Sequence, residues 1–129
     1  MIIEETIKQW HQLLEAKDPS QLKNLLADDV VFHSPVLHTP QKGKALTTMY
    51  LSAAFYVLTN SGFKYIREVL QDNQAVLEFE AVVDDIVVNG VDMIECDENG
   101  KITDFKVLVR PLKGLQMLQT KMFELLSKK

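Results

Sequence analysis

Residues 91–102 read VDMIECDENGKI, and this stretch decides how the chain is interpreted. It begins as an apolar, strand-like run, passes through four residues that tolerate turn geometry, and continues into a second β-prone run. One acidic residue, Asp92, interrupts the apolar run. In an alternating strand Asp92 shares a face with Ile94 and Cys96, so we expect its side chain to point into the protein.

A buried carboxylate at Asp92 needs a hydrogen-bond partner or a proton. Burying an ionised carboxylate alone is costly, and the usual outcome is a raised pKa and a neutral acid that can donate a hydrogen bond. Asp92 is therefore our first candidate site residue. The alternative is a structural acid that is bonded to Trp10, Tyr50 or a backbone N–H and contacts no ligand.

Similar strand-like runs surround this stretch, at residues 63–70, 75–83, 86–96 and 101–110. Short turns separate them, and four strands joined in this way predict an antiparallel meander. Asn89-Gly90 is a competing hairpin signal. We interpret it as a bulge or tight spot within a long strand, because using it as the turn would leave Asp84-Asp85 inside a strand.

The rest of the chain predicts helices and one further strand. Apolar residues at helical spacing predict an amphipathic helix that ends at Asp18-Pro19, and Pro19 begins a second short helix that ends near residues 27–28. The other expected segments are a first strand over residues 29–34, a rim loop over 35–43, a third helix over 44–58 that ends at Asn60-Ser61-Gly62, and a terminal helix after Pro111 that ends at Lys128-Lys129.

These elements predict one α+β domain over residues 1–129. We expect a cone-shaped, strongly curved antiparallel sheet of about five strands in a meander, covered on its concave face by three N-terminal helices, plus a C-terminal helix. The length of 129 residues and the hydrophobic content of 47% suit a single domain with a real core. The interior of such a cone is the expected place for a small ligand.

Composition narrows the possible partners. The formal net charge of -4 argues against nucleic-acid binding. The single Cys96 excludes an internal disulfide, and the three histidines lack metal-ligand spacing, so we expect neither a metal nor a cofactor. Acidic residues Glu4 and Glu5 stand where a signal peptide would be basic, and no stretch approaches the ~18 apolar residues of a membrane span. We expect a cytoplasmic protein without a membrane partner.

Three motifs in order resemble the nuclear transport factor two-like superfamily, in its SnoaL-like and ketosteroid isomerase-like group. They are residues 27–35 (ADDVVFHSP) followed by Gly43, residues 91–102, and residues 109–112 (VRPL). The resemblance covers nearly the whole chain. It implies a cone-shaped domain that forms a homodimer through the outer face of its sheet. The mixture of charged residues with Ile66, Val76, Val87, Met93 and Leu108 on the outward positions also suits such an interface.

Ketosteroid isomerases use a tyrosine on the first helix, an aspartate base at the end of the first strand and a protonated aspartate deeper in the cone. The resemblance places the protonated aspartate at Asp92 and the tyrosine at Trp10, whose indole N–H can also donate a hydrogen bond. The base position holds Ser34, which is not a base near neutral pH. His33 or His38 would have to replace it, and both residues are ordinary candidates for the surface or rim.

Two functions remain open from the sequence. The first is a binding protein without a complete catalytic set, whose pocket holds a small apolar molecule, such as a cyclic or aromatic compound with one carbonyl oxygen. The second is an enzyme of isomerase, cyclase or lyase type, with Asp92 as proton donor or oxyanion stabiliser and Trp10 as its catalytic partner. The missing base favours the first. The candidate ligand-binding residues are Trp10, Phe32, Ser34, Tyr50, Phe79, Asp92, Phe105 and Val107.

Overall fold

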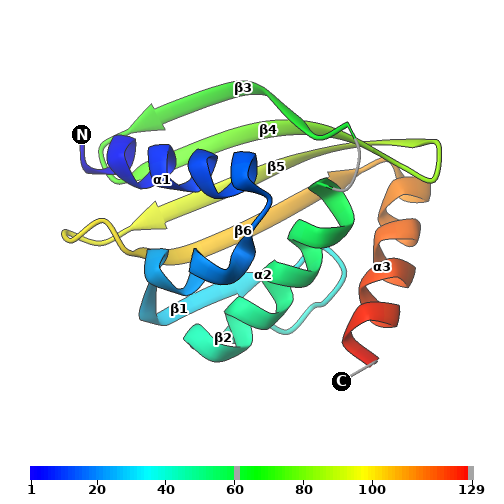
Figure 1. Ribbon diagram of the computed structural model, residues 1–129, viewed down its shortest axis with the longest axis horizontal. Helices are drawn as coiled ribbons and strands as arrows, with labels where there is room; N and C mark the ends of the chain where they lie inside the picture. The colour runs from blue at the N-terminus through cyan, green and yellow to red at the C-terminus, as the bar shows by residue number, and fades with distance from the viewer. Residues whose placement is uncertain (60–61, 128–129) are drawn as a thin grey trace.

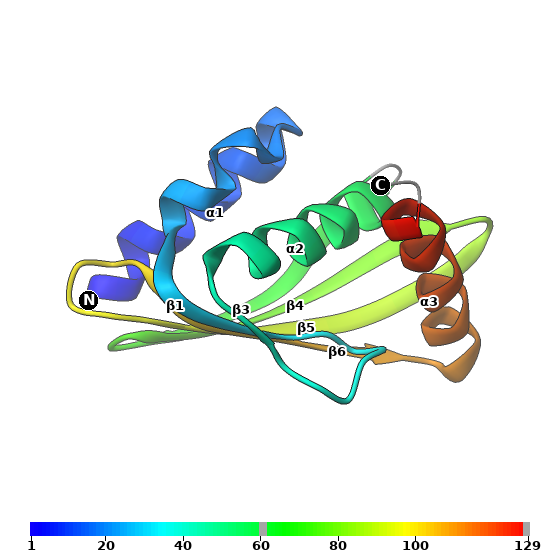
Figure 2. The ribbon, with the colours of Figure 1, turned by 90° about the horizontal axis from the view of Figure 1, so that it is seen from below.

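A curved, open sheet of six strands carries the fold, and the helices α1, α2 and α3 lie on one of its faces in the computed structural model (Figures 1 and 2). The structure describes residues 1–59 and 62–127. The strand order is β2-β1-β6-β5-β4-β3. This confirms the predicted α+β class and curved sheet. The elements are α1 (Ile2–Ala16), the 3-10 helix η1 (Pro19–Leu25), β1 (Leu26–His33), β2 (Gln41–Lys42), α2 (Lys44–Thr59), β3 (Lys64–Gln71), β4 (Gln74–Val83), β5 (Ile86–Cys96), β6 (Ile102–Arg110) and α3 (Leu112–Ser127).

Strands β3 to β6 form the predicted antiparallel meander. Asp84 and Asp85, with φ of 50° and 65°, make the tight turn between β4 and β5, because aspartate tolerates the left-handed conformation that such hairpin turns require. Gly90 lies inside β5 opposite Phe79, in an unbroken register. A Cβ at Gly90 would lie 2.3 Å from Cζ of Phe79, so this position is a tight spot and not a bulge.

The first strand differs from the prediction in its start and its pairing. It begins at Leu26, directly after η1, and pairs parallel with β6 and antiparallel with the two-residue β2. The sheet therefore has six strands and one parallel pair. A parallel pair needs a long crossover connection, which α2 and four intervening strands provide here. The rim loop contributes β2, and the N–H of Gly43 closes it with a 2.7 Å hydrogen bond to the carbonyl of Val30.

A β-bulge in the edge strand β3 changes which side chains face the helices. Tyr65 pairs with Phe79, but Arg67 pairs with Glu78, so Ile66 is the extra residue. Glu68 then pairs with the buried Leu77. The bulge therefore places Tyr65 and Glu68, three residues apart, on the same concave face, where regular alternation would separate them.

The core lies between the concave face and the helices. Helix α1 packs over β3, β4 and β5, α2 packs over β1 and β4, and α3 packs against α2, β5 and β6. None of the helices in residues 1–59 and 62–127 lies over the opposite, convex face (Figure 2). In the part of the chain that the structure describes, no helix is long and apolar enough to cross a membrane. Asn60, Ser61, Lys128 and Lys129, which we took as helix-end signals, lie outside the described residues.

Candidate functional site

Three side chains from three elements form a hydrogen-bonded chain that ends at Asp92. The indole Nε1 of Trp10, on α1, donates to Oη of Tyr65, on β3, over 2.8 Å. Tyr65 Oη in turn donates to Oδ2 of Asp92, on β5, over 2.5 Å. Asp92 is buried, with 5% of its surface exposed. The expected partnership between Trp10 and Asp92 is therefore indirect, because the single indole N–H is used by Tyr65.

The environment of Asp92 favours the neutral acid. Burial raises the pKa of the Asp92 carboxyl to about 7, and the hydrogen bond from Tyr65 opposes that rise only in part. The same burial, together with the nearby Asp92 carboxyl, raises the pKa of the Tyr65 phenol well above its ordinary value. The phenol of Tyr65 therefore keeps its proton and donates to Asp92, whereas the Asp92 carboxyl gains or loses its charge near neutral pH.

Asp92 lines a partly open, mainly apolar cavity between the sheet and the helices. Of the described residues that line it, only Asp92 and Tyr65 carry titratable groups. Tyr65 occupies one carboxyl oxygen of Asp92, and the other oxygen, Oδ1, has no hydrogen bond to a described residue. The carboxyl group can therefore present one oxygen, with or without a proton, to a molecule in the cavity.

The cavity as it stands is small. Its volume is about 30 Å³, which holds about two water molecules, whereas an engineered cavity that binds benzene measures about 150 Å³. Phe79 and Phe105 fill much of the space from the sheet side, and Leu58 of α2 and Leu118 of α3 close it from the helix side. A ring-sized ligand must push these helix side chains outward.

Five of the eight predicted ligand-binding residues line this cavity: Trp10, Phe79, Asp92, Phe105 and Val107. The other three lie elsewhere. Phe32 is fully buried behind Phe105, at 6.0 Å between ring centroids. Ser34 uses its Oγ to accept a 3.2 Å hydrogen bond from the N–H of Val36, and Tyr50 is half-buried on α2. Contact with a ligand stays a prediction for the five residues that line the cavity. The other three residues do not line it.

Tyr65 is the site residue that the sequence reasoning missed. We considered Trp10, Tyr50 and backbone N–H groups as partners of Asp92. The signal for Tyr65 was present in the alternation of Phe63, Tyr65 and the outward Ile66 along the edge strand. Pairing could not be read from that pattern, because the contact depends on β3 and β5 being separated by one strand, β4.

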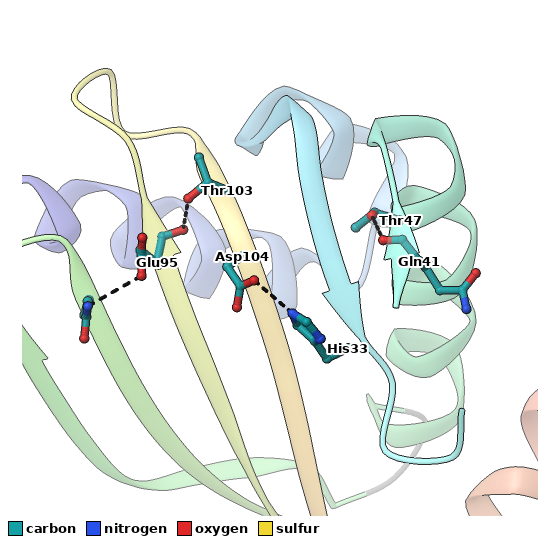
Figure 3. A network of polar contacts seen from close by, with 7 residues as sticks. His33, Gln41, Thr47, Glu95, Thr103 and Asp104 are labelled. Carbon is teal, nitrogen blue, oxygen red and sulfur yellow. Dashed lines mark hydrogen bonds and ion pairs between the residues drawn. The ribbon is translucent and has the colours of Figure 1, made fainter. Parts of the chain in front are cut away.

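The two histidines considered as replacement bases lie away from the cavity. Nε2 of His33 is 2.9 Å from Oδ1 of Asp104, on the next strand β6 (Figure 3). His38 is exposed in the loop before β2. The third histidine, His11, lies beside the site: its ring is 5.4 Å from the ring of Tyr65, and its Nε2 is 2.7 Å from Oε2 of Glu68. Among the described residues, no group of His, Cys, Asp and Glu side chains is arranged to hold a metal ion.

A curved, open sheet with three helices on one face is the architecture of the nuclear transport factor two-like class of α+β domains. Within that class the chain belongs to the SnoaL-like domain family, whose model matches residues 7–105. A search of curated proteins gave no match.

Solved structures agree with this assignment. A steroid delta-isomerase from Pseudomonas aeruginosa is 37% identical with a TM-score of 0.94, over 99% of this chain and 93% of that chain. An uncharacterised protein with a cystatin-like fold from Silicibacter pomeroyi DSS-3 is 31% identical with a TM-score of 0.85, over 92% and 83% of the two chains. A nuclear transport factor two-like protein of unknown function from Mesorhizobium loti shares the fold, at 18% identity and a TM-score of 0.74 over 85% and 92%.

Proposed function

We propose that the protein binds a small, apolar, cyclic carbonyl compound between the sheet and the helices, with neutral Asp92 donating a hydrogen bond to the carbonyl oxygen. The observation that carries this proposal is the free Oδ1 of a buried carboxyl that faces an otherwise apolar cavity. A structural acid needs no such oxygen, because each of its polar atoms would find a partner within the protein.

The role of Tyr65 in this proposal is to fix the carboxyl group. Its hydroxyl accepts from Trp10 and donates to Oδ2 of Asp92, so the proton of the neutral acid belongs on Oδ1. Donation to a ligand carbonyl in an apolar, water-poor site is stronger than the same hydrogen bond in water. Apolar contact with Phe79, Phe105 and Val107 would supply most of the affinity.

An isomerase-type reaction on the same compounds is the second candidate, and one observation favours it. The steroid delta-isomerase from Pseudomonas aeruginosa is 37% identical to this chain over almost its full length. Such a reaction also needs a base, and among the described lining residues only Asp92 and Tyr65 are titratable. Since Asp92 is assigned here to the carbonyl oxygen, binding without turnover is the primary proposal.

Ligand titration followed by tryptophan fluorescence tests the binding proposal. Trp10 is the only tryptophan of the chain and belongs to the site, so its emission reports directly on the cavity. The probe is 4-phenylcyclohexanone, a two-ring ketone. The affinity of the wild type for this ketone should fall about tenfold for each pH unit above 7, because ionised Asp92 cannot donate a hydrogen bond to a carbonyl.

Two variants and one control complete the experiment. Asp92→Asn should keep an affinity that no longer depends on pH, since the amide still donates, and Asp92→Leu should lose about tenfold or more. Asp104→Asn, on the far face, should behave as the wild type. Affinity that is independent of pH between 6 and 9 and unchanged in Asp92→Leu would overturn the proposal. Conversion of a β,γ-unsaturated cyclic ketone to its conjugated isomer, followed by ultraviolet absorbance, would establish the isomerase instead.

For the convex face we propose a homodimer in which two sheets meet face to face. Several apolar side chains are exposed there, among them Val87, Met93 and Leu108 with 57%, 40% and 53% of their surfaces exposed. Across the strands, Glu80 of β4, Asn89 of β5 and Arg110 of β6 stand in one row. A two-fold axis along β5 would bring β4 of one copy over β6 of the other, and so Glu80 opposite Arg110 of the second copy.

Sedimentation at micromolar concentration tests the dimer. The wild type should run at twice the mass of one chain, and Leu108→Glu should run as a folded single chain. Glu80→Arg should weaken the dimer, and adding Arg110→Glu should restore it. The control is Gln119→Glu on the exposed side of α3, which should leave the dimer intact. A wild type that sediments as a single chain contradicts this proposal.

A further inference from the structure

A groove on the surface adjoins the cavity and shares part of its wall. It runs between the C-terminal half of α1 and the edge strand β3, with a volume of about 480 Å³. Four residues line both the groove and the cavity: Leu14, Thr59, Phe63 and Tyr65. A ligand that enters the cavity at this end therefore keeps part of its length in the groove.

The groove carries a polar pair of its own. His11 and Glu68 line it, their side chains are 32% and 34% exposed, and the 2.7 Å contact joins Nε2 of His11 to Oε2 of Glu68. The edge of the His11 ring packs against the ring of Tyr65, at an interplanar angle of 60°. The aromatic ring of Tyr65 thus separates two polar groups, with Asp92 on the cavity side and His11 on the groove side.

The β-bulge at Ile66 is what brings Glu68 to this place. In a regular strand Glu68, three residues after Tyr65, would lie on the face opposite to Tyr65, which is the convex face. The register shift between Tyr65 and Arg67 turns it toward α1 and His11. Bulges are common next to binding sites, where they re-aim one side chain. The bulge therefore places Glu68 beside His11, an arrangement that core packing alone does not require.

The pair fixes the hydrogen-bonding character of His11. A carboxylate only accepts hydrogen bonds, so Nε2 of His11 carries the proton that points to Glu68. Nδ1 of the neutral ring is then an acceptor, and it has no hydrogen bond to a described residue. An acceptor that is oriented by a neighbouring carboxylate suits a hydroxyl group on a ligand.

From this arrangement we infer that the groove is a second subsite, in which Nδ1 of His11 accepts a hydrogen bond from a hydroxyl group at the far end of the ligand. Glu68 is the positioning residue that holds the ring and its tautomer. The ligand class narrows accordingly to hydroxy-ketones with a rigid apolar skeleton, whose carbonyl meets Asp92 and whose hydroxyl reaches the groove. The inference rests on the proposed binding of a carbonyl compound in the cavity.

A matched pair of ketones tests the subsite. The probes are 4-phenylcyclohexanone and 4-(4-hydroxyphenyl)cyclohexanone, which differ only in the hydroxyl at the end opposite to the carbonyl. Binding is followed by Trp10 fluorescence at pH 7.5, where an ordinary imidazole is mostly neutral, and the imidazole nitrogens of His11 are observed by NMR. Partial ionisation of Asp92 at this pH weakens the binding of both ketones alike, so the ratio of their affinities still reports on the groove. The wild type should bind the hydroxylated ketone about five- to tenfold more tightly, which is the value of one neutral hydrogen bond. The Nδ1 resonance should shift only with that probe.

The decisive variant is His11→Phe, which keeps an aromatic ring against Tyr65 and removes both nitrogens. It should abolish the preference for the hydroxylated ketone, measured as the ratio of the two affinities in the same variant. Glu68→Leu should reduce the preference and change the tautomer seen by NMR. His38→Gln, in an exposed loop, is the control and should keep the preference.

The outcomes separate the two proposals. If the wild type binds both ketones with equal affinity, or if His11→Phe retains the preference, the subsite is wrong while the cavity proposal stands. If neither ketone changes the Trp10 emission, the proposed binding function fails and the subsite fails with it.

Discussion

The two faces of the sheet treat acidic side chains in opposite ways. On the concave face Asp92 has one phenol as its partner, and no basic side chain lies among the described residues that line its cavity. On the convex face Glu78 pairs with Arg67 over 3.3 Å and Asp104 pairs with His33 over 2.9 Å. The concave face thus holds an acid on β5 without a basic partner among the described residues, whereas the acids of the adjacent strands β4 and β6 lie against Arg67 and His33 on the convex face.

The difference shows what each face can do. An acid without a cation in an apolar cavity keeps its proton to about pH 7 and can serve as a hydrogen-bond donor to a ligand. Acids that lie against basic side chains at a partly wet surface suit a polar rim or an interface. Four substitutions, from the largest expected effect to the smallest, test this contrast.

Asp92→Asn should change the pH dependence of stability more than any other substitution. The folded protein keeps a proton on Asp92 up to about pH 7, whereas the unfolded chain releases it near the ordinary pKa of 3.8. The native state binds more protons in this window, so the wild type loses stability as the pH rises from about 4 through 7. The loss amounts to at most about 4 kcal/mol, and the variant escapes it.

Urea unfolding of both proteins at pH 4, 6 and 8 measures this effect. The difference in unfolding free energy between variant and wild type should move in favour of the variant as the pH increases. Asp104→Asn on the convex face should not show this trend. Parallel pH curves for Asp92→Asn and the wild type would mean that Asp92 is ionised in the fold, and the contrast between the faces would disappear.

Gly90→Ala tests how tightly the concave face is packed. The added Cβ would lie 2.3 Å from Cζ of Phe79 and 2.8 Å from the backbone oxygen of Leu108. Overpacking of this kind costs about 2 to 3 kcal/mol, more than the gain of about 0.5 to 1 kcal/mol from replacing a strand glycine. Thermal and urea unfolding should show the loss. Gln119→Ala, at an exposed position of α3 away from the sheet, should stay within about 0.5 kcal/mol of the wild type.

Much of this architecture could be predicted from the sequence, and the failures have physical causes. The meander and its Asp84-Asp85 turn follow from alternation and from residues that tolerate left-handed geometry. The burial of Asp92 follows from the same alternation. The parallel pairing of β1 with β6 could not be predicted, because pairing between segments about seventy residues apart leaves no local pattern in the sequence.

The site was predicted only in part for the same reason. Trp10 and Asp92 were found through their own segments, but the residue that joins them, Tyr65, was not, and neither was the His11–Glu68 pair. A bulge shifts the register by one residue and reverses the faces of everything beyond it. Regular alternation from Tyr65 would therefore place Glu68 on the convex side, whereas the bulge places it on the concave side.

Tyr65→Phe tests whether the hydrogen-bonded chain is a unit. The substitution leaves the indole N–H of Trp10 and one oxygen of Asp92 without their partner, at a cost of about 2 kcal/mol. It also removes the donor that stabilises ionised Asp92, so the pKa of Asp92 should rise further. The loss of stability should accordingly be larger at pH 8 than at pH 5. Carbon-13 NMR of the Asp92 carboxyl checks the pKa, and an unchanged value would break the link between the two residues.

Arg67→Ala should have the smallest effect and completes the contrast from the convex side. Its partner Glu78 also accepts a 3.1 Å hydrogen bond from Asn89, and the Arg67 side chain is 76% exposed. Water and salt therefore screen the ion pair, which should contribute less than about 1 kcal/mol and lose that contribution at 1 M salt. Unfolding of both proteins at low and high salt measures it. A loss of stability as large as that of Tyr65→Phe would contradict this prediction. It would mean that the folded chain depends on the charges of its convex face as strongly as on the buried hydrogen bonds of its concave face. The proposed division between a site face and an interface face would then fail.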